Sequence, residues 1–338
     1  MAEALTVAVI GPTGLVGREI VELLSERQFP LGELRLLGSV KTAGGELEHD
    51  DRRQKVALLG PGSFDGVDVA FFAAGPAVAG EFAPAAADAG AAVIDVSSRF
   101  RLADGVPLVV PEVNALAIAD RRESGIVASP SATTVGLAVV LAPLAEAAGL
   151  RRVVVSTYQA ASGGGRRAMQ GLSEETLDLL SARGPGRPRF AHRRAFNCVP
   201  QVGAIEPGGA TTHELHVVEE TRKVLGNPAL ALSVTAVRVP TFYGHAMAVT
   251  LETEEALGAA AAADLLREAR GVVLHAGEED AYPTPVEIAG ADAIHVGRIR
   301  DDTAAEQSIA LWVSLDNVRK GGALNAVEIA EILVRDYL

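Results

Sequence analysis

The stretch LTVAVIGPTGLVGREIVELLSERQ, residues 5–28, decides the fold. Its first six residues are apolar or β-branched, as in the buried strand of a parallel sheet. The apolar residues that follow Gly17 have helical spacing. Between the two segments lies the loop GPTGLVG, residues 11–17. A strand that enters a helix through a glycine loop predicts the first βα unit of an α/β domain.

More strand candidates follow at residues 33–39, 67–75 and 91–98. A helical segment, AVAGEFAPAAADAG, separates the last two strands. Strands that alternate with helices predict a doubly wound parallel sheet of the α/β class. Right-handed crossovers would bring the carboxyl ends of these strands to one edge, where ligands bind in such folds. That edge is marked by Gly11, Gly38, Gly75 and Ser97.

The pattern changes after about residue 150, where long β-rich stretches alternate with helical connections. This predicts a second, α+β domain with an antiparallel or mixed sheet. The Gly-, Pro- and Arg-rich segment 181–200 reads as an exposed loop or arm. The last helix, NAVEIAEILVRDYL, is amphipathic and is expected to return to the first domain. The predicted domains are residues 1–131 with about 318–338, and residues 132–317.

Composition narrows the function classes. The chain has 338 residues, of which 49% are hydrophobic, and its formal net charge is -13. This negative charge argues against nucleic-acid binding. It still permits local basic patches to select anionic ligands. Its one cysteine excludes an internal disulfide and suits a cytoplasmic protein. We see no secretory signal at the start and no apolar run long enough to span a membrane.

The glycine loop predicts dinucleotide binding. In G-x-x-G-x-x-G the first glycine permits a tight turn, the second a close approach to a pyrophosphate, and the third close helix–strand packing. After the second strand the sequence has no acidic residue that would bind a ribose 2′-hydroxyl, which favours NADP over NAD. A purely structural turn and a solvated Lys41 are the alternatives. The candidate cofactor residues are Gly11, Thr13, Gly14, Leu15, Val16, Gly17, Ser39, Lys41, Thr42 and Gly75.

Ordered motifs along nearly the whole chain resemble the aspartate-semialdehyde dehydrogenase family. They are GPTGLVG, VIDVSSRFR, VPLVVPEVN, STYQAASGGG, AFNCVPQVG, ETRKVLG, RVPTFYGHA, TPVEIAG, VGRIRDD and DNVRKGGALNAVEIAEIL. The resemblance implies a Rossmann-type NADP-binding domain, a substrate and dimerisation domain, and a homodimer. It also implies NADPH-dependent reduction of β-aspartyl phosphate to the semialdehyde, on the route to lysine, methionine and threonine.

The resemblance assigns roles to residues in the matching motifs. Arg101 corresponds to the phosphate-binding arginine, and Arg238 to the arginine that pairs with the substrate carboxylate. Gln159 corresponds to a glutamine near the nucleophile, and His245 to the acid/base histidine. Asn325 lies where the family has a polar side chain that contacts the cofactor. Location in an ancestral pocket does not by itself establish use.

The nucleophile departs from the family pattern. The family places a cysteine in a Pro-Asn-Cys-Ser/Thr-Thr turn at a helix N-terminus, where helix N–H groups lower the pKa of its thiol. Here the turn, residues 130–134, reads Pro-Ser-Ala-Thr-Thr, so Ala132 occupies the cysteine position. Ser131 and Thr133 flank it, but a shift of one residue turns a helical side chain by about 100°. We expect Cys198 to be a buried or semi-buried small apolar residue.

Two further departures are consistent with the first. The family's Glu and Lys for the substrate amine and phosphate fall at His213 and His216. Two histidines at i and i+3 are too weak a signature to predict a metal site, even with His245 or Glu214 as a further ligand. Pro76 follows Gly75 where the family often has a second glycine near the cofactor, and it removes a backbone donor.

The sequence therefore supports two main hypotheses. The first is a cysteine-less, Usg-type homologue that keeps the fold and the dimer, binds NADP weakly if at all, takes a small anionic or amino-acid-like ligand, and lacks the parent reaction. The second is an NADPH-dependent reductase of a small carboxylated aldehyde or ketone, with His245 as acid/base. Residual dehydrogenase activity is a third possibility. The physiological ligand is open.

Overall fold

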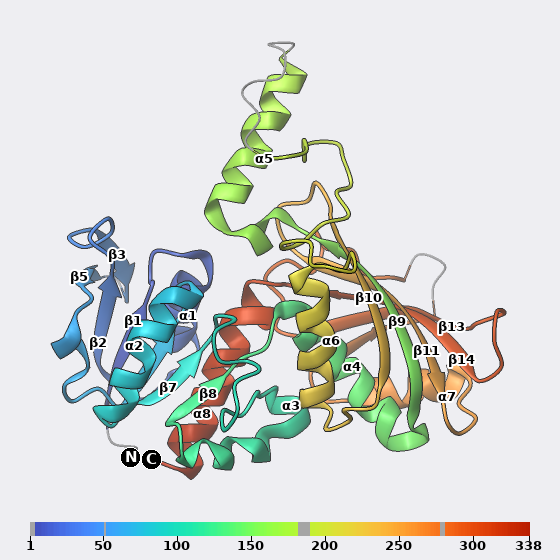
Figure 1. Ribbon diagram of the computed structural model, residues 1–338, viewed down its shortest axis with the longest axis horizontal. Helices are drawn as coiled ribbons and strands as arrows, with labels where there is room; N and C mark the ends of the chain where they lie inside the picture. The colour runs from blue at the N-terminus through green and yellow to red at the C-terminus, as the bar shows by residue number, and fades with distance from the viewer. Residues whose placement is uncertain (1–3, 51, 182–189, 278–280) are drawn as a thin grey trace. The chain divides into compact units, whose positions relative to one another are not determined.

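The computed structural model describes residues 4–50, 52–181, 190–277 and 281–338 (Figure 1). The chain divides into two compact units. The first comprises Met1–Ser131 and Gly322–Leu338, and the second comprises Ala132–Gly321. The amino-terminal and carboxy-terminal parts of the chain therefore build the first unit together, while the second is inserted between them.

The first unit contains a six-stranded parallel sheet in the order β5-β2-β1-β6-β7-β8. This confirms the predicted doubly wound parallel sheet. The predicted strand at residues 67–75 is shorter in the structure because Pro76 begins a helix after the N-cap Gly75. The strands are β1 (Leu5–Ile10), β2 (Leu31–Gly38), β5 (Ala57–Leu58), β6 (Val69–Phe72), β7 (Ala92–Asp95) and β8 (Ile126–Ala128), and an antiparallel pair lies beside them, β3 (Glu46–His49) and β4 (Arg52–Lys55).

Helices flank this sheet, and the C-terminal helix belongs to the same core. Spacing of three and four residues puts Ala326, Ile329, Ala330 and Leu333 on one face, and all four are fully buried in the first unit's core. Arg27 at the end of α1 donates to Glu331, with Nε 2.6 Å from Oε1. The helices are α1 (Leu15–Glu26), α2 (Pro76–Asp88), α3 (Pro111–Asn114) and α8 (Asn325–Asp336), with 3₁₀ turns η1 (Pro61–Phe64) and η2 (Ala115–Arg122).

The second unit is built on a mixed six-stranded sheet in the order β10-β9-β11-β14-β13-β12. This confirms the prediction of an α+β domain. Along β9, residues 153, 155, 157 and 159 are buried while the intervening residues are half-buried or exposed, as expected when one face packs on helices. The strands are β9 (Leu150–Gln159), β10 (Ala231–Arg238), β11 (His245–Thr253), β12 (Val272–His275), β13 (Ile294–Asp301) and β14 (Ser308–Leu315).

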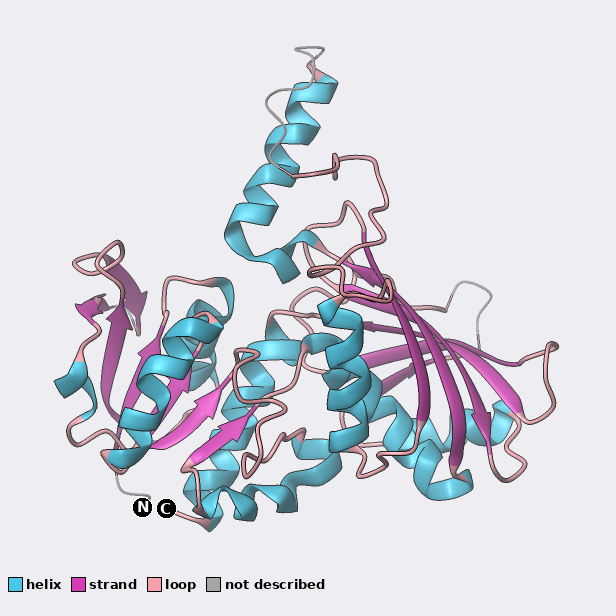
Figure 2. Ribbon diagram, viewed as in Figure 1, coloured by secondary structure: helices cyan, strands magenta, loops and turns pink. Residues whose placement is uncertain are grey.

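Three helices of the second unit, α4, α6 and α7, pack against this sheet, as Figure 2 shows. The apolar run that was predicted to be a buried helix forms α4, and nine of its first ten residues, from Thr133 to Leu141, are buried. The helix α5 follows a short 3₁₀ turn, η3, and carries Leu177 and Leu180 on its exposed face. The bounds are α4 (Ala132–Ala148), η3 (Ala161–Gly164), α5 (Gly165–Leu180), α6 (Thr212–Val224) and α7 (Ala259–Glu268), and the π-helical turn η4 (Arg319–Leu324) precedes α8.

Two expectations for the segment that follows α5 have different outcomes. The predicted arm at residues 181–200 falls partly outside the described residues, because 182–189 are not among them. The prediction that Cys198 is buried or semi-buried is wrong, since the structure places it at the surface. Its neighbours Phe196 and Asn197 are also exposed, so this part of the segment lies at the surface as a whole. Nowhere among the described residues is there a helix with the length and hydropathy needed to cross a bilayer.

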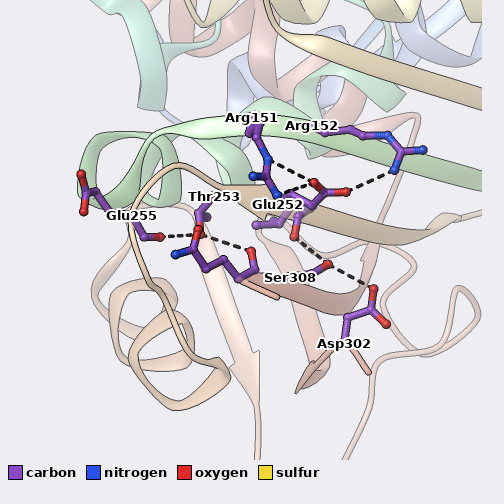
Figure 3. A network of polar contacts seen from close by, with 9 residues as sticks. Arg151, Arg152, Glu252, Thr253, Glu255, Asp302 and Ser308 are labelled. Atoms are coloured by element: carbon purple, nitrogen blue, oxygen red, sulfur yellow. Dashed lines mark hydrogen bonds and ion pairs between the residues drawn. The ribbon is translucent and has the colours of Figure 1, made fainter. Parts of the chain in front are cut away.

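A polar network connects β9, β11 and β14 at the end of the sheet where β9 and β14 begin (Figure 3). Glu252 on β11 accepts from Arg151 Nη2 at 2.7 Å and from Arg152 Nη1 at 3.1 Å. Ser308 donates to the Leu251 carbonyl at 3.2 Å and to Asp302 Oδ2 at 3.1 Å. The arginines are more than half-exposed, so each ion pair stabilises the fold by only about 0.2–1 kcal/mol.

The pair His275–His295 gives the second unit a pH-dependent stability. His275 Nε2 lies 2.9 Å from His295 Nδ1. Burial, and then the charge of His275, lower the pKa of His295 from 6.5, so the folded state binds fewer protons there than the unfolded chain. We expect stability to decrease as the pH falls below about 6.5, and His295→Asn to reduce that decrease.

Thermal unfolding at pH 7.5, 6.5 and 5.5 measures this effect. His192→Asn, a change at an exposed loop histidine, is the matched control and should keep the wild-type dependence. An unchanged pH dependence in His295→Asn would show that the pair does not couple protonation to folding.

Candidate functional site

The glycine loop of the first unit has the geometry of a phosphate-binding turn. Gly11 follows β1 with φ +84°, and its carbonyl accepts from Gly14 N at 3.1 Å. A Cβ on Gly17 would collide with the Gly11 carbonyl and would lie 3.0 Å from Pro12 Cα. The first and third glycines are therefore required by the backbone, as predicted from the motif spacing.

The first turn of α1 is suited to an anionic group. Its N-cap, Gly14, provides no side chain that caps the helix, and the first turn contains no acidic residue. The positive end of the helix dipole at this turn is therefore not neutralised by an acidic residue of its own first turn. Thr13, Leu15 and Val16 are half-buried around the turn. These features fit a pyrophosphate.

The turn after β2 carries the residues that were expected to bind a 2′-phosphate. Ser39 and Lys41 are exposed, and the Ser39 carbonyl accepts from Thr42 N at 2.9 Å and from Thr42 Oγ1 at 3.2 Å. A cation and a hydroxyl at an exposed turn suit a phosphate, and the first unit has no acid between Gly38 and Gly45. The residues present thus fit NADP better than NAD.

Gly75 and Asn325 belong to the same unit but differ in environment. Gly75 is the N-cap of α2, and a Cβ there would meet no atom within 4 Å. Asn325 is fully buried, and its Nδ2 donates to the Val109 carbonyl at 3.0 Å and to Ser129 Oγ at 2.8 Å. Its Oδ1 is buried without a hydrogen-bond partner in the described chain, so an acceptor is left for a ligand N–H.

Arg101 is held by the backbone of the first unit. Its Nε donates to the Ser129 carbonyl at 3.1 Å and its Nη2 to the Val96 carbonyl at 2.9 Å. Asp95 nearby is buried and accepts from Ser97 N and Oγ, both at 2.9 Å. Burial raises the pKa of Asp95, while the charge of Arg101 opposes this shift. These contacts orient the guanidinium.

In the second unit, Ala132 is the first residue of α4. A Cβ added at Gly321 would collide with the Ala132 methyl and would lie 2.9 Å from Ala132 Cα, so the two residues pack in direct contact. No acidic residue occupies the first turn of α4. The structure thus presents a helix N-terminus of the kind that lowers a thiol pKa, but the side chain there is a methyl group.

Gln159 connects the start of α4 to α6. Gln159, at the end of β9, is buried, and its Nε2 lies 3.2 Å from Thr133 Oγ1 and 2.8 Å from His213 Nε2. Thr133 Oγ1 lies 3.5 Å from the same histidine nitrogen. The side chains of residues 133, 159 and 213 therefore form one cluster next to Ala132, and the role of Gln159 stays a prediction.

Arg238 and His245 meet at the turn η3. Arg238 Nη1 donates to the Ala160 carbonyl at 2.6 Å, and Ala160 N donates to His245 Nδ1 at 3.3 Å. A Cβ on Gly163 would lie 2.7 Å from Arg238 Nη1 and 3.0 Å from His245 Nε2. The absence of a side chain at Gly163 therefore leaves room for Arg238 Nη1 and His245 Nε2 to lie close together. The catalytic and substrate-binding roles of these two residues stay predictions.

The electrostatics keep this histidine neutral. Burial, followed by the charges of Arg238 and His213, lowers the pKa of His245 well below 6.5. Because its Nδ1 accepts a backbone hydrogen bond, the neutral ring carries its proton on Nε2. Burial, and then the charge of Arg194, lowers the pKa of Arg238 to about 10, so the guanidinium stays charged at neutral pH.

Comparison with known proteins identifies the family. Residues 6–121 match the model of the semialdehyde dehydrogenase NAD binding domain, and residues 141–320 match that of the semialdehyde dehydrogenase dimerisation domain. The chain belongs to the aspartate-semialdehyde dehydrogenase family. This confirms the resemblance seen in the sequence motifs.

Relatives match the chain over its full length. It is 41% identical to aspartate-semialdehyde dehydrogenase 2 of Vibrio cholerae, covering 100% of both chains, and 41% identical to the Aquifex aeolicus aspartate-semialdehyde dehydrogenase, covering 98% of both. The crystal structure of aspartate semialdehyde dehydrogenase II from Vibrio cholerae complexed with ASA superposes with a TM-score of 0.96 over 100% of both chains. A probable aspartate-semialdehyde dehydrogenase from Pseudomonas aeruginosa gives 0.94 at 36% identity, covering 99% of this chain and 100% of that one.

Within this aspartate-semialdehyde dehydrogenase fold, two residues near the site, Glu220 and Asn317, were given no role in the sequence analysis. Glu220 is fully buried and accepts from Thr134 Oγ1 at 2.9 Å. Asn317 Oδ1 accepts from Ser162 Oγ at 2.9 Å and from Gly244 N at 3.1 Å, which fixes η3 beside the start of β11. Glu220 is a charged residue within residues 217–224, whose apolar residues have helical spacing. That position was the signal in the sequence from which its burial could have been predicted.

His213 and His216 lie on α6, as the sequence predicted, and both are half-buried. The described residues contain no group of three or more His, Cys, Asp or Glu side chains that could hold a metal ion. Glu214 is occupied elsewhere, because it closes the capping box of α6 with Thr211 and accepts from Ala236 N at 2.7 Å. The two imidazole rings can donate or accept hydrogen bonds, according to their tautomers.

Proposed function

We propose that this chain is an NADP-binding member of the aspartate-semialdehyde dehydrogenase family that does not perform the family's phosphorylating dehydrogenation. The observation that carries the proposal is Ala132, which begins α4 beside Gln159 and His213 and presents a methyl group in contact with Gly321. A thioester cannot form on a methyl group, and loss of a covalent nucleophile removes orders of magnitude in rate.

Neighbouring groups do not replace the thiol. The hydroxyl of Thr133 is hydrogen-bonded to Gln159, and one helical residue separates it by about 100° from the direction of Ala132. Cys198 is exposed in the segment between α5 and α6 rather than at α4. The parent reaction therefore has no nucleophile of the required chemistry at the required position.

The cofactor proposal rests on the first unit. The glycine loop would hold a pyrophosphate, Ser39, Lys41 and Thr42 a 2′-phosphate, and the buried Asn325 Oδ1 an amide N–H. When bound, NADPH supplies a hydride. We also propose that the chain forms a homodimer. The match to the dimerisation domain supports this, and so does one face of β9, where Val154, Ser156 and Tyr158 are only half-buried.

The proposal predicts that wild-type protein does not oxidise aspartate semialdehyde in the presence of phosphate and NADP. The assay follows NADPH formation at 340 nm, with the Vibrio cholerae relative as the positive control. We expect a rate at least 10³-fold below that relative, because the nucleophile is missing. Binding of NADPH is measured separately by fluorescence titration.

The phosphate-dependent assay and the NADPH titration test different parts of the proposal. Robust phosphate-dependent turnover would refute the proposal that Ala132 ends the parent reaction. Absence of NADPH binding at millimolar concentration would refute the cofactor part and would leave a protein of this fold without the family's redox chemistry.

A second candidate function is direct reduction of a small carboxylated aldehyde or ketone. The observation that favours it is the pair Arg238 and His245 at Gly163. Arg238 would orient a carboxylate, and His245 Nε2–H would donate its proton to the carbonyl oxygen as negative charge develops there. Glyoxylate- or succinate-semialdehyde-dependent oxidation of NADPH, lost in His245→Ala, would establish this activity.

A further inference from the structure

Arg194 is a half-buried cation that neither the motifs nor the proposed function uses. It lies just before the extended segment that bridges to β10, and its guanidinium stacks over the Phe190 ring at 3.5 Å. Its Nη1 is buried and has no hydrogen-bond partner in the described part of the chain. A buried, charged N–H group without an acceptor is costly, so its retention calls for a ligand or another explanation.

Two adjacent glycines place Arg194 and Arg238 at the same end of the sheet. A Cβ on Gly163 would lie 2.7 Å from Arg238 Nη1, and a Cβ on Gly164 would lie 3.8 Å from Arg194 Nη1. The side-chain positions of these two consecutive residues of η3 therefore lie next to one guanidinium each, and glycine leaves both positions open.

The charges of these groups are only partly balanced by the protein. The charge of Arg194 contributes to the lowered pKa of Arg238, after burial. Burial also lowers the pKa of Arg194, and the carboxylate of Glu175 opposes that shift. Glu175 Oε2 is committed to the backbone, since it accepts from Arg194 N at 2.8 Å and from Ala195 N at 3.1 Å. Two cations close together favour a bound anion with more than one negative charge.

The two histidines near these arginines, His245 and His213, are hydrogen-bonding groups rather than carboxylates. His245 directs its protonated Nε2 to Gly163, beside Arg238 Nη1. The position at which the family resemblance places a glutamate for the substrate amine is occupied by His213, which contacts Gln159. The arginines and histidines here would repel a ligand that carries an ammonium group, whereas they would attract a ligand that carries only carboxylates.

We propose that Arg194 and Arg238 form one anion-binding site and that its ligand is a small dicarboxylate without an ammonium group. Each guanidinium binds one carboxylate, and His245 Nε2–H donates to the carboxylate or carbonyl oxygen between them. This inference deepens the proposed function by naming its ligand class, and it rests on the cysteine-less site described there.

Calorimetry of the intact wild-type chain with succinate, in chloride buffer without phosphate, tests the proposal. Butyrate provides a matched monocarboxylate, and aspartate adds an ammonium group to the dicarboxylate. We expect succinate to bind at least tenfold more tightly than either. In Arg194→Gln we expect a 10- to 100-fold weaker affinity for succinate and an affinity for butyrate within threefold of wild type, because one charged hydrogen-bonding partner is lost.

Arg193→Gln is the matched control, because Arg193 is the exposed neighbour of Arg194. It should keep the wild-type preference for succinate, and thermal unfolding should show that both variants are folded. Equal affinity of wild type for succinate and butyrate would overturn the proposal, as would an unchanged succinate affinity in Arg194→Gln. NADPH binding reports on the proposed function separately, because the glycine loop belongs to the first unit and Arg194 to the second.

Discussion

Ala132→Cys is expected to raise kcat/KM for phosphate-dependent oxidation of aspartate semialdehyde at least 10³-fold above wild type, mostly through kcat. The new thiol would lie at the N-terminus of α4, where no acidic side chain occupies the first turn and the helix N–H groups stabilise a thiolate. Gln159, Arg238 and His245 already surround η3 and the start of α4. A covalent nucleophile contributes several orders of magnitude in such reactions.

The measurement is NADPH formation at 340 nm, together with the pH dependence of alkylation by iodoacetamide. A Cys198→Ser background removes the exposed native thiol from both readouts. Ala132→Ser is the matched control and should remain inactive, because a hydroxyl at this position has no lowered pKa. If the single variant is silent, we expect His213→Glu and His216→Lys added to it to restore turnover. Silence of the triple variant would exclude residue 132 as the nucleophile position.

Gly17→Ala is expected to abolish measurable NADPH binding and to destabilise the first unit by about 3 kcal/mol. A methyl at this position collides with the Gly11 carbonyl oxygen, which the turn also uses to accept from Gly14 N. Both contacting groups are backbone, so relief requires α1 to move away from β1. That movement displaces the helix N-terminus that we propose binds the pyrophosphate, and NADPH affinity should fall at least 50-fold.

Gly60→Ala is the matched control, because a Cβ at Gly60 meets no atom within 4 Å, the residue has φ -158°, and it is not one of the candidate cofactor residues. We expect it to change unfolding by less than about 1 kcal/mol and to bind NADPH within a few-fold of wild type. Fluorescence titration gives the affinities, and denaturation followed by circular dichroism gives the stabilities. Wild-type affinity in Gly17→Ala would show that NADPH, if bound, does not use the glycine loop.

The parallel sheet was predictable because its signals are local. Six apolar residues, a glycine loop and a helical repeat follow one another within residues 5–28, and β1 and α1 form there. The strand lengths were less predictable, since the end of β6 depends on where Pro76 starts α2. The exposure of Cys198 was not predictable either, because its segment has no regular secondary structure and so no hydrophobic period that would show which side chains are buried.

The site was predictable in identity but not in its supporting contacts. Family motifs indicated Gln159, Arg238 and His245, and each takes part in the cluster around η3 or α4. The sequence assigned no role to Glu220, although it begins the motif ETRKVLG, or to Arg194, because charged residues usually lie at the solvated surface. Their burial depends on tertiary neighbours, such as Thr134 for Glu220 and Phe190 for Arg194. The cofactor and substrate roles themselves stay predictions.

The division of the first unit between the two ends of the chain has a consequence for biosynthesis. Its core includes Ala326, Ile329, Ala330 and Leu333 of α8, which leave the ribosome last. Until then the strands β1 to β8 lack the apolar helix face that covers them, while the inserted second unit, which ends at Gly321, is already complete in sequence. We expect the later part of the chain to fold before the earlier part is finished, and nascent chains stalled before α8 to depend on chaperones.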